Sequence, residues 1–162
     1  GLFYPEEFAR FEAYIPVEEQ DDLVAAYYKR MRSHNTVIRD EACKRWSDWE
    51  SSITTLVPEF VDYAAPVQDH ELSLGLLEAH YFANRMFWYE DNYILNRADK
   101  LVKIPIDIFH GRYDVDCVPG AAYDLKQALP HAKLNIIESS GHSAYEPELL
   151  KALTYFLDDM EV

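Results

Sequence analysis

The chain has 162 residues, of which 49% are hydrophobic, and it carries a formal net charge of −14. A chain of this length and composition is large enough to bury a core and is not expected to be disordered. The negative charge argues against nucleic acid as a partner and disfavours an anionic membrane surface, because both would repel the protein.

The sequence also carries information about its surroundings. No apolar run approaches the roughly 20 residues that a membrane-spanning helix needs. Cys43 and Cys117 have neither metal-type nor disulfide-framework spacing, so we expect a reducing compartment and a cytoplasmic location. Because the sequence begins with Gly1 and not with methionine, we expect it to be a piece of a longer protein.

Helical spacing of apolar residues dominates the first hundred positions. The predicted helices cover residues 17–33, 38–56, 70–88 and a short stretch at 91–102. The apolar stripe of the second helix holds Ala42, Trp46, Trp49, Ile53 and Leu56. That of the third holds Leu74, Leu77 and Tyr81, with Met86 and Trp88 beyond them.

The pattern changes at Ile104, where alternation typical of strands begins. We expect strands at Ile104–Phe109 and Lys133–Glu138, each followed by a helix, at 120–130 and 147–160. This order is one parallel βαβ unit with a further helix, and two parallel strands alone make a poor sheet. The sequence therefore predicts an α/β protein with a helical domain at 1–102 and the last βαβα part of a larger sheet at 103–162.

An acid follows the first predicted strand and a histidine follows the second, at the edge of the sheet where function gathers in open α/β folds. Asp114 and His142 have the chain order of the acid and the base in α/β-hydrolases. In such a pair the histidine takes a proton from a nucleophile, and the carboxylate fixes its tautomer. The alternative, that Asp114 caps a turn and His142 is an ordinary loop residue, stays open at this point.

Two carboxylates fall on or beside the apolar stripes of the predicted helices. Glu50 lies four positions after Trp46, and Glu78 lies four positions before Phe82. A carboxylate on an apolar face is costly unless a cation meets it. Either the glutamates pair with an arginine, such as Arg45 or Arg85 at the edge of the stripe, or they form an aromatic-walled pocket for a cationic ligand.

Several segments together resemble the proline iminopeptidases, also called prolyl aminopeptidases. "HGRYDVDCVP", "AYDLKQALPHAKL" and "SSGHSAYEPELL" are similar to the C-terminal segment of that family, and "KRWSDWE" and "LEAHYFANRMF" to two helical stretches of its cap domain. The resemblance implies a partial α/β-hydrolase fold, with a helical cap at 1–102, and a serine peptidase that releases N-terminal proline from peptides. It implies no metal and no organic cofactor.

The resemblance assigns roles to individual residues. Asp114 and His142 match the acid and the histidine of the catalytic triad. Glu50 and Glu78 match two cap carboxylates that bind the ammonium group of the substrate. The residues that match the lining of the proline pocket are Phe82 and Cys117.

Three positions depart from the family pattern, and one motif is missing. Val118 stands where proline is common, Asp116 where a hydrophobic residue is usual, and Ala79 where a polar residue is usual. The family's nucleophile lies in a Gly-x-Ser-x-Gly elbow and its oxyanion loop resembles HGGPG; neither motif occurs among the 162 residues. We therefore expect the C-terminal half of such an enzyme, inactive by itself and prone to self-association through unpaired strands.

Two other hypotheses stay open. The chain is alternatively a catalytically dead α/β-hydrolase-like module that binds an amine ligand or a protein partner. It is also compatible with a different hydrolase of the same fold, and substrates distinguish the two: members without the paired cap glutamates should not need a free N-terminal amine.

Overall fold

The computed structural model describes residues 1–57 and 60–160. They form two compact units. The helical unit consists of Gly1–Ser52 and Glu59–Tyr89, and the strand unit consists of Ile53–Pro58 and Glu90–Val162. One boundary between the two units lies between Tyr89 and Glu90, and a short segment from the first half of the sequence, Ile53–Pro58, belongs to the strand unit. None of the helices in the described ranges has both the length and the apolar character to cross a membrane.

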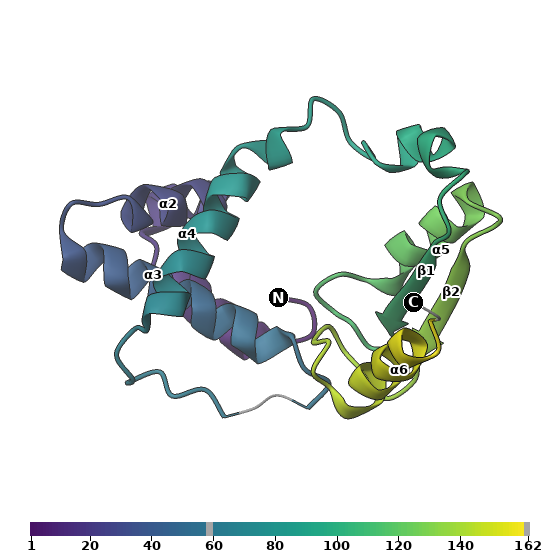
Figure 1. The fold of residues 1–162 in the computed structure, drawn as a ribbon. Coiled ribbons are helices and arrows are strands. Elements are labelled where there is room, and N and C mark those ends of the chain that lie inside the picture. Colours follow the sequence, from purple (N-terminus) through teal and green to yellow (C-terminus); the bar gives the residue numbers. More distant parts are fainter. Residues whose placement is uncertain (58–59, 161–162) are drawn as a thin grey trace. The chain divides into compact units, whose positions relative to one another are not determined.

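The helical unit is built from α-helices and short 3-10 helices (Figure 1). In chain order they are α1 (Pro5–Ala13), η1 (Val17–Asp22), α2 (Leu23–Met31), α3 (Thr36–Ile53), α4 (Asp69–Ala83) and η2 (Arg85–Phe87). The sequence analysis did not predict α1. The helix predicted at 17–33 begins instead as a 3-10 turn, and Asp22 then caps α2 by accepting a hydrogen bond from Ala25 N at 3.0 Å.

Stacked aromatic rings hold the core of the helical unit together. The rings of Phe11 and Tyr27 are parallel with centroids 4.2 Å apart, and Trp46 meets both rings edge-on. Tyr27 is fully buried, and its hydroxyl donates to the carbonyl of Phe11 at 2.7 Å. This bond satisfies the one polar group that the ring carries into the core, and burial raises the pKa of that hydroxyl.

The face that α4 buries is not the predicted stripe. Gly75 and Ala79 are buried, whereas Leu74, Leu77 and Tyr81 are each exposed. A Cβ atom added to Gly75 would lie 3.6 Å from the Cα of Cys43 on α3, so small residues let these two helices approach closely. The predicted stripe is therefore wrong as a description of the packed face, because residue size at the crossing decides the contact.

The end of the predicted third helix is also wrong. It was expected to continue to residue 88, but α4 ends at Ala83 and Asn84 caps it by donating to the carbonyl of His80 at 2.8 Å. The three residues Arg85, Met86 and Phe87 then have φ values of 51°, 54° and 58°. Left-handed backbone cannot continue a right-handed helix.

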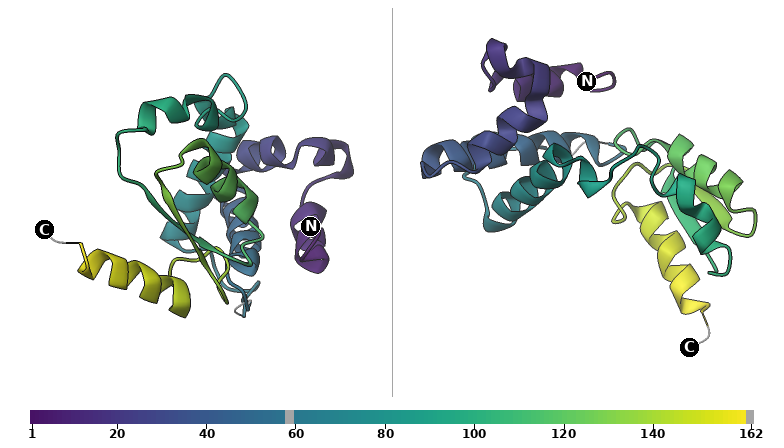
Figure 2. Two further views of the ribbon diagram at one scale, coloured as in Figure 1. Left: turned by 90° about the vertical axis from the view of Figure 1, so that its right-hand side faces the viewer. Right: turned by 90° about the horizontal axis from the view of Figure 1, so that it is seen from above.

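The strand unit contains a parallel two-stranded sheet covered by helices. Its elements are η3 (Leu95–Leu101), β1 (Asp107–Gly111), α5 (Pro119–Ala128), β2 (Lys133–Ile137) and α6 (Pro147–Asp158). The strands pair in parallel from Asp107↔Lys133 to Gly111↔Ile137. Figure 2 shows α5 and α6 on opposite sides of the two strands. The predicted mixture of helices and parallel strands is confirmed.

Two packing groups hold the elements of the strand unit together. On β1 the ring of Phe109 contacts that of Phe156 on α6, with centroids 5.1 Å apart. Buried Leu129, at the end of α5, packs with Ala98 and Ala132. The first strand begins three residues later than predicted, because Pro105 has no N–H to give to the ladder and pairing with Lys133 begins at Asp107.

Candidate active site

The loops that follow β1 and β2 run together at the carboxyl ends of the strands. Arg112 N donates to Ile137 O and Tyr113 N donates to Ser140 O, both at 2.9 Å. Gly111 makes this approach possible: a Cβ atom there would lie 1.9 Å from the carbonyl oxygen of Gly141. The two loops that carry the predicted acid and base are thereby held side by side.

The structure brings Asp114 and His142 into contact. Oδ2 of Asp114 lies 3.1 Å from Nδ1 of His142. The carboxylate, which is 6% exposed, accepts hydrogen bonds in its ionised form, so the neutral imidazole carries its proton on Nδ1. Its Nε2 then keeps a lone pair, and the imidazole is 37% exposed. This geometry is that of a base oriented by an acid.

The other oxygen of Asp114 shapes the turn after β1. Oδ1 accepts hydrogen bonds from the backbone N–H groups of Asp116 at 3.0 Å and Cys117 at 2.8 Å. A single carboxylate therefore fixes both the turn and the imidazole. Asp114 therefore does both things that the sequence analysis treated as alternatives: it caps a turn and it contacts His142.

His110 is a polar group at this site that the sequence analysis missed. Its Nε2 lies 2.6 Å from the carbonyl oxygen of Cys117 and 3.3 Å from Oδ2 of Asp114. A carbonyl only accepts, so Nε2 of His110 donates and holds the far end of the turn. The available signal was a histidine in "IFHG", a polar side chain in an otherwise apolar strand.

Glu146 is a second residue that the sequence analysis missed. Its buried carboxylate accepts hydrogen bonds from Leu56 N at 2.6 Å and from Gly141 N. The carbonyl of Thr54 in turn accepts from His142 N at 3.0 Å and from Ser143 N at 2.8 Å. Residues 54–56 thus support the loop that carries His142, and no local pattern in the sequence indicates this.

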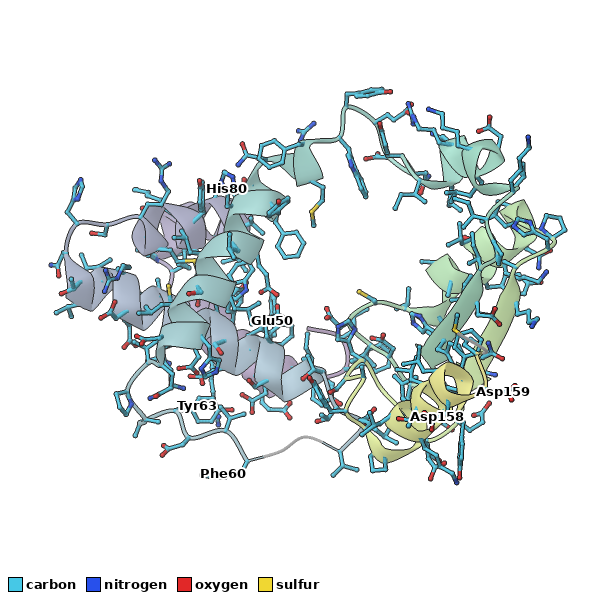
Figure 3. All side chains as sticks on the ribbon, viewed as in Figure 1. Glu50, Phe60, Tyr63, His80, Asp158 and Asp159 are labelled. Carbon is cyan, nitrogen blue, oxygen red and sulfur yellow. The ribbon has the colours of Figure 1, made fainter. Side chains whose placement is uncertain are left out.

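Trp46 connects the predicted substrate-binding residues of the helical unit. Its Nε1 donates to Oε2 of Glu78 at 2.8 Å, and its ring centroid lies 6.1 Å from that of Phe82. Glu50, labelled in Figure 3, lies on α3 four residues after Trp46. Side chains at positions i and i+4 of a helix lie on the same face. Glu78 and Phe82 therefore meet at one indole, and Glu50 lies one helical turn further along α3.

Arg45, one of the arginines considered as a partner for the two glutamates, pairs with Glu41 and not with Glu78. Its Nε donates to Glu41 at 2.8 Å on the exposed side of α3. Among the residues that the structure describes, Glu78 has the indole of Trp46 as its partner and no cation within 4.0 Å. The carboxylate is only partly buried and stays available to a cationic ligand.

The predicted site residues are divided between the units. Glu50, Glu78 and Phe82 lie in the helical unit, and Asp114, Cys117 and His142 lie in the strand unit. Within the strand unit, side-chain donor atoms of Asp116, Cys117 and His142 all lie within 4.8 Å of one another. The described residues thus contain an acid–base pair, a carboxylate–aromatic group and a cluster of metal-type donors.

An oriented imidazole at the carboxyl ends of parallel strands is typical of enzymes with α/β folds. No protein-family model matches the chain. It is 36% identical over 152 residues to a probable proline iminopeptidase of Leptolyngbya boryana, covering 93% of this chain and 47% of that protein. It is 36% identical over 156 residues to a proline iminopeptidase of Xylella fastidiosa, covering 96% of this chain and 50% of that protein.

A plant relative extends the same likeness. The chain is 35% identical over 164 residues to a proline iminopeptidase of Arabidopsis thaliana, covering 99% of this chain and 43% of that protein. The chain spans about half the length of the curated relatives that it matches. The resemblance drawn from the motifs is confirmed: nearly the whole chain is homologous to one half of the proline iminopeptidases.

Proposed function

We propose that this chain supplies the C-terminal half of a prolyl aminopeptidase, a serine peptidase that releases proline from the N-terminus of peptides. The observation that carries the proposal is the contact between Asp114 and His142, at loops that the chain shares in order and motif with that family. Similarity over nearly the whole chain to half of each relative supports the same division of the enzyme.

In this proposal His142 is the general base. A serine hydroxyl from the other half of the enzyme gives its proton to Nε2 as its oxygen attacks the carbonyl carbon of proline. Asp114 stabilises the imidazolium through Nδ1–H, and the proton then passes to the leaving amine of the peptide. Water, activated in the same way, releases proline and restores the serine.

The group around Trp46 would recognise the substrate. An N-terminal proline carries a secondary ammonium group, and an exopeptidase must detect that charge to reject the interior of a chain. Glu50 and Glu78 supply two negative charges, and Phe82 supplies an apolar surface for the pyrrolidine ring. The hydrogen bond from Trp46 Nε1 orients Glu78 and leaves its other oxygen for the ligand.

The remaining parts of the proposal concern organisation. Residues 1–102 would contain the cap, and residues 103–162 the last βαβα part of an α/β-hydrolase core. The reaction would need no metal and no organic cofactor, and the location would be cytoplasmic. Self-association of the 162-residue chain, with its two-stranded sheet, stays a prediction.

The test is hydrolysis of proline p-nitroanilide by the complete protein that contains these residues. We expect turnover that His142→Ala abolishes, and no turnover by the 162 residues alone, since they lack the serine elbow. A folded complete protein that binds prolinamide without hydrolysing any proline substrate would instead support the inactive amine-binding module. Hydrolysis of blocked peptides as fast as free ones would support a different hydrolase.

A further inference from the structure

Three chemically different donors meet beside the Asp114–His142 pair. They are a carboxylate oxygen of Asp116, the sulfur of Cys117 and a ring nitrogen of His142, all within 4.8 Å of one another. Nε2 of His142 lies 3.7 Å from Oδ2 of Asp116. Because each of these residues is exposed, an ion from solution can reach the cluster.

We propose that Asp116, Cys117 and His142 form a binding site for a divalent cation of the zinc type. Zinc accepts nitrogen, sulfur and carboxylate ligands in a tetrahedron, and its bond lengths place the ligand atoms about 3.3 to 3.8 Å apart. The separation between His142 and Asp116 already falls in this range. Small rotations of exposed side chains bring in the sulfur, and the fourth position remains open to water.

The surroundings of the cluster are those of a metal site. A histidine that binds a metal through one ring nitrogen usually donates its other N–H to a carboxylate, which fixes the ring and makes it more basic. Asp114 does this at Nδ1 of His142 with Oδ2. Its Oδ1 holds the backbone N–H groups of Asp116 and Cys117. One buried carboxylate thus positions all three ligands.

Charge and ligand type determine which ion is favoured. On binding, the S–H bond of Cys117 is replaced by a sulfur–metal bond and the proton passes to solvent. The thiolate and the carboxylate of Asp116 then neutralise the two charges of the cation. Sulfur and imidazole favour zinc or cobalt over magnesium and calcium, which prefer oxygen ligands.

The site has a consequence that rests on the proposed function. The metal would use Nε2 of His142, the same nitrogen that is proposed to accept the proton of the serine. One nitrogen cannot bind the metal and accept a proton at the same time, so the bound ion would inhibit the peptidase. The cation is thus a regulator of the site and not a cofactor of the reaction.

The test is metal binding by the complete protein after removal of metals with a chelator. Titration with cobalt should give one ion per chain and a thiolate-to-cobalt charge-transfer band, which zinc then displaces. Mutation of a residue that only hydrogen-bonds to a metal ligand typically lowers metal affinity about 10- to 100-fold. Cys117→Ser replaces a direct ligand, so it should lower the affinity at least as much and remove the band. Cys43→Ala, in which the buried cysteine is changed, is the matched control and should keep the band.

The outcomes separate this site from the proposed function. A band that persists in Cys117→Ser, or equal affinity for magnesium and zinc, would overturn the metal site whatever the enzyme does. Binding with the expected variants in a protein that never hydrolyses proline substrates would overturn the proposed function alone. In an active enzyme, Asp116→Asn should require at least about tenfold more zinc for half-inhibition than the parent protein.

Discussion

Asp114 Oδ2 lies 3.1 Å from Nδ1 of His142, while the second oxygen of the same carboxylate holds the backbone of the turn that contains Asp116 and Cys117. The orientation of the imidazole and the shape of the turn therefore depend on one buried side chain. A change at Asp114 alters both, whereas a change at Asp116 leaves the pair with His142 in place.

This difference predicts the relative sensitivity of the two aspartates in the complete enzyme. Asp114→Asn should lower kcat about 10⁴-fold, because an amide can donate toward the ring and favour the wrong tautomer. Asp116→Asn should have a much smaller effect in metal-free buffer. Steady-state kinetics with proline p-nitroanilide measure both, and a greater loss in Asp116→Asn would show that the acid is wrongly assigned.

Glu50 and Glu78 should act on recognition of the substrate amine. Glu78→Gln can still accept the hydrogen bond from Trp46, so the fold should persist while one negative charge is lost. We expect each glutamine variant to lose about 1–3 kcal/mol in kcat/KM, mainly through KM. An N-blocked substrate, hydrolysed slowly, is the control; an equal loss on that substrate would contradict the amine pocket.

Gly111 should tolerate no side chain. In Gly111→Ala the new Cβ would lie 1.9 Å from the carbonyl oxygen of Gly141 and 2.6 Å from that of Ser140. We expect a loss of at least about 2 kcal/mol in the free energy of unfolding, measured by urea denaturation. Gly120→Ala on α5 is the matched control, since nothing lies within 4 Å of its Cβ; it should be neutral or slightly stabilising. Similar values for the two variants would refute the close approach.

Glu146→Gln tests the support of the histidine loop. The carboxylate accepts from Leu56 N and Gly141 N, but an amide has one accepting oxygen and would turn its NH₂ group toward the other donor. The expected cost is about 1.5–3 kcal/mol of unfolding free energy, as for other bonds to charged groups. Hydrogen exchange should become faster at Gly141 and Leu56, and unchanged exchange there would count against this role.

The two cysteines should differ in reactivity with iodoacetamide. Burial raises the pKa of the Cys43 thiol to about 11, whereas Cys117 is exposed. The thiolate is the reactive form, so about one thousandth of Cys43 is reactive at pH 8, and its labelling should rise as the pH approaches 11. Peptide mapping at pH 8 should find label on Cys117 in the folded protein and on both cysteines in denaturant. Equal labelling of both in the folded protein would be incompatible with the buried thiol.

Local pattern predicted the strand unit well, because its signals lie close together in the sequence. Alternating isoleucines marked both strands, and the order of acid and histidine placed Asp114 and His142 at the same edge of the sheet. The structure brings that pair together as the topology required. The boundaries differ by one to three residues: β1 begins three residues later and ends two residues later than predicted, and β2 ends one residue earlier, because the pairing between the strands decides where each one ends.

The features that the sequence did not predict depend on contacts that apolar spacing does not encode. The buried side of α4 is set by close approach at Gly75 and Ala79, so its larger apolar residues lie outside. Glu146 accepts a hydrogen bond from the backbone of Leu56, 90 positions earlier in the chain, and His110 donates one to the carbonyl of Cys117. Neither contact leaves a periodic trace in the sequence, so apolar spacing could not reveal them.

The support of the His142 loop by residues 54–56 has a consequence during synthesis of the protein. Leu56 and its acceptor Glu146 are 90 positions apart, and the intervening stretch includes all of α4 and both strands. At about 5–20 residues per second of translation, the amide of Leu56 waits about 5–18 seconds for its carboxylate. The loop that carries His142 therefore lacks this anchor until Glu146, the residue directly before α6, has been made.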